Sequence, residues 1–406
     1  MEKKDKYRKQ IVKELYFNKV LSCAELSLMV NKSIPLTTKI LNDLIERNWV
    51  VEKGYAASSG GRRPVMYSLK KDVLYVIAVS MDQFVTRIAV MDMQNNFVTE
   101  VKKVDLPLAK NPRALSALIS NISSVIKRSG IAKSKIAGIG IGMPGFIDVE
   151  KGINYSFFEM GNKSITEQIS AKVDLPVYID NDSSLIALAE LRFGAAKNAN
   201  NTMIINIGWG IGLGMILDGK LFRGNNGFAG EFSHIPLFSK GKLCSCGKRG
   251  CLETESSLLT VIEKAKVGIK ARKQSILGDL IKANVEQASE MIINAAQEGD
   301  QFAIELLSEA GYTIGRGVAI LILLFNPKVI ILSGRGSLAG KMWQAPIQQA
   351  INEHCIPKLS AHTAIEISTL GYQAELMGAA SLVMDNYERD DIIKKHLICP
   401  HQNLLL

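Results

Sequence analysis

The residues best suited to chemistry form a short cysteine-rich segment. Cys244, Cys246 and Cys251 place three thiols within eight residues, and His234 precedes the first of them by ten residues. Three thiolates and one imidazole make the closed tetrahedral shell that proteins use for structural zinc. Cysteines so close in sequence seldom reach disulfide geometry, although free buried cysteines are the alternative. The spacing therefore predicts a structural Zn²⁺ site in a reducing cytoplasm, with the ligands His234, Cys244, Cys246 and Cys251.

The first 72 residues hold most of the net positive charge. They carry 15 basic and 8 acidic residues, a net charge of +7, whereas the other 334 residues carry 34 and 31, a net charge of +3. Apolar spacing predicts helices at 5–18, about 22–29 and 33–45, followed by strands at 49–53 and 65–69. This is the order of a winged helix-turn-helix, so we expect residues 1–72 to bind double-stranded operator DNA.

The third helix and the loop between the two strands supply the candidate DNA contacts. Small polar residues at the start of that helix can reach base edges in the major groove. Arginines beside the loop glycines can follow the phosphate backbone or enter the minor groove. The DNA-binding residues predicted in this way are Ser33, Thr37, Thr38, Lys39, Asn42, Arg62 and Arg63. A protein-interaction module with a solvated basic face is the alternative.

From residue 73 onward, strands and helices alternate in two halves that each open with a hairpin. The first half reads as strands at 73–79, 87–91 and 97–101, and the second begins with a strand at 203–207 and a glycine-rich turn. This pattern predicts an α/β architecture with duplicated subdomains and a ligand in the cleft between them. The late apolar run Val318–Phe325 is too short to cross a bilayer, and the charged start resembles no secretory signal, so no membrane partner is expected.

A series of motifs in this part resembles the ROK family, named for repressors, open reading frames and sugar kinases. The series is Ile139–Gly145, Asp180-Asn181-Asp182 with Glu190, Ala229–His234 with Ser233 in place of the family's glycine, Cys244–Glu253, Asn326-Pro327, Ser333-Gly334 and Gly378-Ala379-Ala380. With the DNA-binding front end, the chain is similar to the N-acetylglucosamine and xylose repressor branch. The resemblance implies an α/β fold, in which an N-terminal winged helix-turn-helix precedes a two-lobed, actin-like ATPase fold.

The resemblance also divides the chain and implies a sugar site. The expected parts are residues 1–72 (DNA-binding domain), 73–195 (first lobe), 196–385 (second lobe with the zinc site and a helical dimerisation region) and 386–406 (tail). The positions that match the family's sugar contacts are Asn181, Asp182, Glu231, His234 and Glu253. By resemblance, the zinc braces this site, because His234 can bind metal through one ring nitrogen and face the sugar with the other. Taken alone, the Asn181-Asp182 pair could equally be a helix N-cap.

The family's phosphate-binding turns are altered in this chain. Ser80 stands where the kinases have the aspartate that organises the metal, and Asp82 stands where they have the first glycine of the turn. In the second turn, Trp209 stands between two glycines where the kinases have threonine. We therefore expect no catalytic residues and no enzyme activity. Asp182, at the position of the kinase base, is expected to act only as a sugar contact.

These expectations describe a sugar-responsive transcriptional regulator, a repressor released from its operator by a sugar or sugar derivative. Two-fold operators predict a homodimer or a dimer of dimers, with the helical region after Ile281 as candidate interface. The helix at about 374–387 and the tail are expected to pack on the DNA-binding head. The alternatives are a ROK sugar kinase with an appended head and a regulator controlled by a protein partner.

Overall fold

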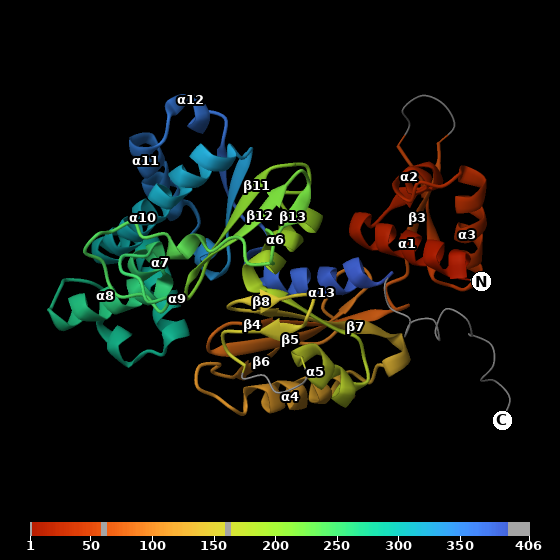
Figure 1. The fold of residues 1–406 in the computed structure, drawn as a ribbon, viewed down its shortest axis with the longest axis horizontal. Helices are drawn as coiled ribbons and strands as arrows, with labels where there is room; N and C mark the ends of the chain where they lie inside the picture. Colours follow the sequence, from red (N-terminus) through yellow and green to blue (C-terminus); the bar gives the residue numbers. More distant parts are fainter. Residues whose placement is uncertain (1, 58–62, 159–163, 389–406) are drawn as a thin grey trace. The chain divides into compact units, whose positions relative to one another are not determined.

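The computed structural model describes residues 2–57, 63–158 and 164–388. Backbone contacts divide the chain into two compact units (Figure 1). The first joins Met1–Asn181 to Leu376–Leu406, and the second is Asp182–Glu375. The domain boundaries expected from the sequence remain predictions.

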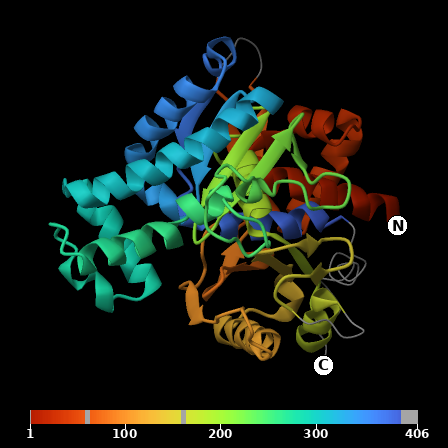
Figure 2. The ribbon, with the colours of Figure 1, turned by 60° about the vertical axis from the view of Figure 1, so that its left-hand side comes forward.

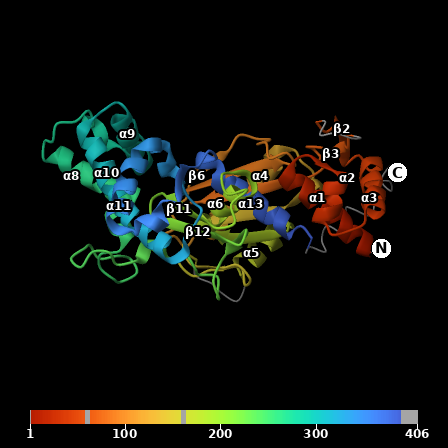
Figure 3. The same ribbon diagram turned by 90° about the horizontal axis from the view of Figure 1, so that it is seen from above.

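Three helices lie beside a small antiparallel sheet at the start of the first unit (Figure 3). The strand order is β1-β3-β2, with antiparallel pairing throughout. The elements of this head are α1 (Glu2–Asn18), β1 (Leu21–Ser22), α2 (Cys23–Met29), α3 (Ile34–Glu46), β2 (Val50–Tyr55) and β3 (Val65–Leu69). The expected winged helix-turn-helix order is confirmed, and the tip of the wing lies outside the described residues.

Local side-chain chemistry fixes the helices of the head. Ser22 caps α2 in a capping box, because its hydroxyl accepts from the Glu25 N–H while the Glu25 carboxylate accepts from the Ser22 N–H. Arg8 of α1 donates to both carboxylate oxygens of Asp43 in α3, at 2.6 and 2.8 Å. Burial alone would raise the pKa of Asp43, but the hydrogen bonds from Arg8 and Lys4 hold it at about 2. The ion pair therefore clamps α1 to α3.

A five-stranded sheet of order β10-β7-β4-β5-β6 forms the rest of the first unit. Its strands are β4 (Tyr75–Met81), β5 (Val85–Asp92), β6 (Lys102–Asp105), β7 (Ile136–Met143) and β10 (Val177–Asn181), beside the small pair β8 (Ile147–Asp148) and β9 (Ile153–Asn154). Apolar residues of α4 (Ala114–Ser129) and α5 (Ile165–Val173) pack on one face of the sheet. On the opposite face lies α13 (Ala374–Asn386) (Figure 1). A Cβ at Gly140 would lie 1.9 Å from the Ala379 carbonyl oxygen, so only glycine permits this approach.

The strand expected at 97–101 is wrong. Phe97 forms a single bridge with Met91, and the paired strand is β6, which begins only at Lys102. Asp92 closes the preceding turn by accepting hydrogen bonds from the N–H groups of Gln94 and Asn96. The true edge strand alternates half-buried and exposed residues and begins with two lysines. Such a polar edge strand is common in natural sheets but has no apolar signal in the sequence.

The second unit repeats the strand order of the first, as β13-β12-β11-β14-β15. Its strands are β11 (Thr202–Ile207), β12 (Ile211–Leu217), β13 (Lys220–Phe222), β14 (Val329–Ser333) and β15 (Ala364–Ile367). In each sheet an opening antiparallel pair is extended on one side by a third antiparallel strand and on the other by two parallel strands. The duplicated α/β halves expected from the sequence are therefore confirmed.

The remaining helices of the second unit are mostly amphipathic. They are α6 (Asp182–Phe193), α7 (Leu252–Ser256), α8 (Leu258–Lys270), α9 (Val285–Gln297), α10 (Gln301–Phe325), α11 (Gln344–His354) and α12 (Pro357–Ser360). Helices α10 and α11 lie side by side (Figure 2), at a contact where a Cβ on Gly315 would meet Ile347 and Ala350. Helix α10 is long and apolar enough to cross a bilayer, but 67% of its most apolar window is buried inside the protein, which is typical of a core helix.

The end of α13 contacts α1 of the head within the first unit. Lys13 donates to the Asp385 carbonyl at 3.3 Å and lies 3.6 Å from the Glu388 carboxylate. The Lys9 ammonium stands 5.6 Å from the centre of the Tyr387 ring. The expectation that this helix packs on the head is confirmed, while the tail from residue 389 lies outside the described residues.

Candidate metal centre and effector site

The four predicted zinc ligands come together in the second unit. Nδ1 of His234 lies 3.4 Å from Sγ of Cys244, and Sγ of Cys246 lies 3.6 Å from Sγ of Cys251. All four ligand atoms lie within 4.8 Å of one another. Zinc–sulfur bonds of about 2.3 Å in a tetrahedron place the ligands roughly 3.8 Å apart. The cluster therefore has the size and the donor set of a structural metal site.

Two glycines let the loop fold around this cluster. Gly247 has φ +84° and Gly250 has φ +71°, in the left-handed region that side chains disfavour. A Cβ at Gly250 would also lie 1.7 Å from the Phe238 carbonyl oxygen. The Gly250 N–H donates to Lys242 and its carbonyl accepts from Leu237, which returns the chain to Cys251. The glycines between the cysteines are thus required by backbone geometry.

The three thiols of the cluster lie in different surroundings. Burial, together with the neighbouring thiols, raises the pKa of Cys251 to about 12. Hydrogen bonding to the Lys248 backbone instead lowers the pKa of the exposed Cys246. A buried thiolate at Cys251 requires a compensating positive charge, and a coordinated metal deprotonates such thiols outright. The residues therefore fit a bound metal ion.

Two carboxylates, Glu231 and Glu253, stand beside His234, the imidazole of the candidate metal cluster. Its Nδ1 faces the thiols, while its Nε2 lies 3.6 Å from Oε2 of Glu231. The Glu231 side chain is 43% exposed and that of His234 is 22% exposed, so both are accessible to a small ligand. Loss of solvent raises the pKa values of Glu231 and Glu253, and His234 opposes both shifts. The serine that replaces the family's glycine, Ser233, lies in a short 3₁₀ helix without positive φ, so the substitution leaves this turn intact.

Glu253 connects the metal loop to the second glycine-rich turn. It lies in the first turn of α7, two residues after Cys251, and its Oε2 accepts from the Ile211 N–H at 3.4 Å. A Cβ at Gly210 would stand 2.3 Å from the same oxygen, so this glycine admits the carboxylate. Glu231, His234 and Glu253 therefore belong to one polar cluster, and their role as sugar contacts remains a prediction.

Asp182 begins α6, directly after Asn181 ends β10. Its Oδ1 accepts from the Ser183 N–H at 2.7 Å, and Nδ2 of Asn206 lies 3.5 Å from its Oδ2. The Asn181 side chain donates to the Gly145 carbonyl in the first unit at 3.2 Å. Asp182 therefore has the local bonds of a helix start, and its two carboxylate oxygens face different neighbours, Ser183 and Asn206. Asn206 was not predicted, because nothing in its local sequence marks it.

The first phosphate turn is filled by the chain's own groups. Oδ1 of Asp82 accepts from the N–H groups of Phe84 and Val85, at 2.8 and 2.7 Å, which are the amides that such a turn would offer to a phosphate. The buried Arg87 donates to the Ser80 hydroxyl at 2.7 Å. A guanidinium thus stands beside the position of the kinases' metal-organising aspartate. In the second turn, the Trp209 ring is buried and lies over the Arg335 guanidinium.

Most of the predicted DNA contacts are accessible in α3. Ser33, Thr38, Lys39 and Asn42 are exposed, as is Arg63 beside the wing. Thr37 is a correction, because it is completely buried and its hydroxyl donates to the Ser33 carbonyl, so it cannot reach DNA. The predicted residue Arg62 lies outside the described part of the chain.

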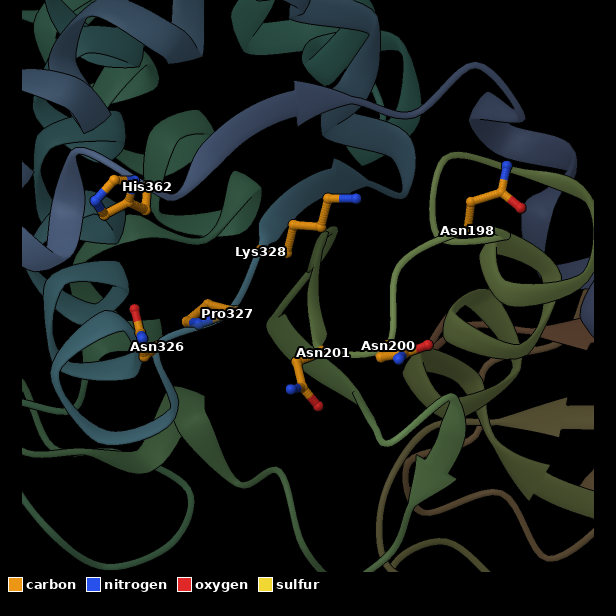
Figure 4. A pocket seen from close by; sticks show the side chains of 7 residues that line it. All are labelled: Asn198, Asn200, Asn201, Asn326, Pro327, Lys328 and His362. Atoms are coloured by element: carbon orange, nitrogen blue, oxygen red, sulfur yellow. The ribbon is translucent and has the colours of Figure 1, made fainter.

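A polar pocket of about 390 Å³ lies in the second unit, at the N-terminal ends of β11 and β14. It is lined by Asn198, Asn200, Asn201, Asn326, Pro327, Lys328 and His362. Figure 4 shows that these side chains point in different directions rather than toward one centre. Asn201 also accepts from the Asp218 N–H, and Asn326 ends α10 with φ +43°. These residues shape loops, and they include none of the predicted site residues.

Comparisons with known proteins identify the family of the chain. The ROK family profile matches residues 76–386. A xylose repressor of Caldicellulosiruptor bescii is 33% identical over 93% of this chain and 94% of its own length, and a glucokinase of Halalkalibacterium halodurans is 33% identical over 70% and 88%. The crystal structure of a ROK transcriptional regulator, a homologue of the E. coli MLC protein, has a TM-score of 0.77 at 26% identity and covers 96% of this chain and 99% of that one. The fold, the metal cluster and these matches lead to one conclusion: the chain belongs to the ROK family.

Proposed function

We propose that the protein is a cytoplasmic, sugar-responsive transcriptional repressor without catalytic turnover. One combined observation carries the proposal. The acid–histidine cluster of Glu231, His234 and Glu253 is accessible, whereas the chain's own side chains occupy the two turns that bind phosphate in the kinases of the family. Asp82 consumes the amides of the first turn, and Trp209 occupies the second. Similarity to a xylose repressor extends over 93% of the chain, whereas similarity to a glucokinase covers 70%.

Glu231, His234 and Glu253 suit a sugar because they offer carboxylate and imidazole groups to paired hydroxyls on rigid elements. We propose Asn181 and Asp182 as further contacts at the start of α6. Zinc is the metal proposed for the cluster, since three thiolates and one imidazole favour it and leave no open coordination position. When bound, it would neutralise the thiolates and hold the ring of His234 in place.

The head is proposed to bind operator DNA through Ser33 at the N-cap of α3 and through Thr38, Lys39 and Asn42 within that helix. Arg62 and Arg63 are proposed as further contacts. A sugar can release the operator only if it binds the released state more tightly than the DNA-bound state. Palindromic operators require paired heads, so we propose a homodimer or a dimer of dimers. The exposed apolar residues Leu323, Leu324 and Ile356 support an interface in the helical region after Ile281.

A kinase activity is the second candidate, because Asp182 keeps its carboxylate at the position of the family's base. A kinase assay decides between the repressor and the kinase. The protein is incubated with ATP, Mg²⁺ and a panel of hexoses, and phosphorylated sugar is measured. We expect no phosphorylated sugar in this assay. Its formation would overturn the proposal of a repressor without catalytic turnover.

The decisive experiment joins a sugar screen to a DNA-binding assay. Operator duplexes selected from a random pool provide the DNA, and thermal unfolding identifies sugars that stabilise the protein. We expect one sugar class to raise the unfolding temperature and to lower operator affinity. If no sugar stabilises the protein, control by a protein partner replaces this proposal.

A further inference from the structure

A buried arginine is enclosed by aromatic rings in the second unit. The Arg335 guanidinium lies 4.5 Å from the ring centre of Trp209 and 4.5 Å from that of Tyr372. Its Nη1 donates to Glu286 at 2.9 Å, and its Nη2 donates to the Tyr372 hydroxyl at 2.5 Å. Arg335 is 6% exposed, as is Trp209. We call these four residues the Arg335 stack.

The stack stands at the edge of the sheet where a nucleotide would be expected. Strands β11 and β14 are parallel neighbours, so their carboxyl ends meet at one edge. Trp209 follows the end of β11, and Arg335 follows the end of β14. Ligands of open α/β sheets bind outside the carboxyl ends of the strands. A Cβ at Gly334 would lie 2.1 Å from Oδ1 of Asn206, so the loop after β14 also approaches β11 closely.

The Arg335 stack contains the same kinds of group that would take part in binding a nucleotide. A nucleotide would bring a flat base for aromatic stacking and an anion for a cationic partner. Here the flat group is the guanidinium itself, with Trp209 and Tyr372 in cation–π contact. The positive charge of Arg335 is paired with the carboxylate of Glu286 in the same chain.

The stack also holds the turn that carries part of the effector site. Trp209 is the middle residue of the Gly208–Gly210 turn, which is closed by a hydrogen bond from the Gly208 N–H to the Gly210 carbonyl. The next amide, that of Ile211, donates to Glu253. Fixing Trp209 therefore fixes the backbone on which the Glu253 carboxylate rests.

We propose that the Arg335 stack is an internal replacement for a nucleotide. It occupies the strand-end position and orders the turn beneath Glu253, so that the effector site is complete without a second ligand. Trp209 and Arg335 are positioning residues in this role. The inference rests on the proposed function, but it makes a separate claim, because it concerns nucleotide exclusion and the order of one turn.

The test uses fluorescent N-methylanthraniloyl-ATP with Mg²⁺ and the full chain. The opened variants are Trp209→Thr with Arg335→Ala, and Tyr372→Ala as a milder opening. Trp209→Phe is the matched control, since it keeps a ring over the guanidinium. Circular dichroism confirms that each variant is folded before titration.

We expect the natural chain and Trp209→Phe to bind the nucleotide more weakly than about 1 mM, and an opened variant to bind at least about tenfold more tightly. Hydrogen exchange of the peptide spanning Gly208–Leu213 should become faster in the opened variants only. Tight binding by the natural chain, or no gain in any folded opened variant, would overturn the proposal. Neither readout involves DNA or sugar, so a failure of the repressor function would be seen separately.

Discussion

Removal of the proposed zinc should release the segment Leu237–Gly250 without unfolding the protein. This segment contains neither helix nor regular strand, and it carries Cys244 and Cys246. Its end leads into Cys251 and Glu253, so the loss of metal should also loosen the acid–histidine cluster. Dialysis against a strong chelator and the variant Cys251→Ser are two independent ways to produce this state.

The size of the effect follows from the backbone of the segment. Fixing 14 residues costs at least about 14 kcal/mol at roughly 1 kcal/mol each. Six backbone hydrogen bonds within the segment return about 6 kcal/mol at a net value of about 1 kcal/mol each. The deficit of about 8 kcal/mol is close to the roughly 10 kcal/mol at the lower end of structural zinc binding. Without metal, the ordered loop is therefore expected to be a minor state.

Limited trypsin digestion measures this directly, because the segment contains Lys240, Lys242, Lys248 and Arg249. The metal-bound protein should resist cleavage there, and the chelated protein should be cut between residues 240 and 249. Added Zn²⁺ should restore resistance to the chelated protein but not to Cys251→Ser. Metal analysis that finds no zinc in protein purified without chelator, or equal protection of both forms, would refute the reasoning.

Three further predictions concern the head, the effector site and the core. Replacing Arg62 and Arg63 by alanine should weaken operator binding about tenfold or more, and the slope of log K against log salt concentration should become shallower by about 1 to 2. Lys240→Ala, which removes one charge in the second unit, is the control. An unchanged slope in the arginine variant would exclude the wing from the DNA contacts. Glu231→Ala should weaken sugar binding by roughly 10- to 100-fold while leaving operator affinity intact, and normal release by the sugar in a DNA-binding assay would contradict its role. Glu190 is completely buried, and burial raises the pKa of its carboxyl although hydrogen bonds oppose the shift. A carboxyl with a raised pKa in the folded state stabilises the fold at low pH, and this stabilisation is lost as the pH rises through the folded-state pKa. The variant Glu190→Gln should therefore reduce the fall of the unfolding free energy with pH above about pH 4.5. Denaturant unfolding at several pH values measures this dependence, and an unchanged pH dependence would contradict the prediction.

The sequence predicts most strongly where local chemistry dictates local geometry. The ligands Cys244, Cys246 and Cys251 are close in the chain, so a short loop with two glycines is enough to gather them. The capping box at Ser22 and the strand at 65–69 likewise depend on neighbouring residues, and both are confirmed. The resemblance to ROK proteins then predicts that His234 and Glu253 belong to the same site. The local sequence around each residue does not by itself determine the distance between them.

Errors arise where packing against distant elements decides the outcome. Thr37 has the polar character of a DNA contact, but its position on α3 faces the inside of the head, and its hydroxyl is satisfied by the Ser33 carbonyl. The apolar residues at 97–101 suggest a strand, yet the neighbouring β5 pairs with the lysine-bearing β6. In both cases residue type is a weaker guide than the side of the element on which tertiary contacts place it.

The two phosphate turns show how far a lost motif can be interpreted. Asp82 and Trp209 mark both turns as altered, but a sequence reveals only that the expected groups are missing. The first replacement is local, because Asp82 bonds the amides two and three residues further along. The second needs Arg335 from another strand end, and parallel pairing of β11 with β14 is what brings it beneath the ring. If the chain binds no nucleotide, as proposed, its own residues take the place of the ligand at both turns, and the loss is a replacement rather than simple decay.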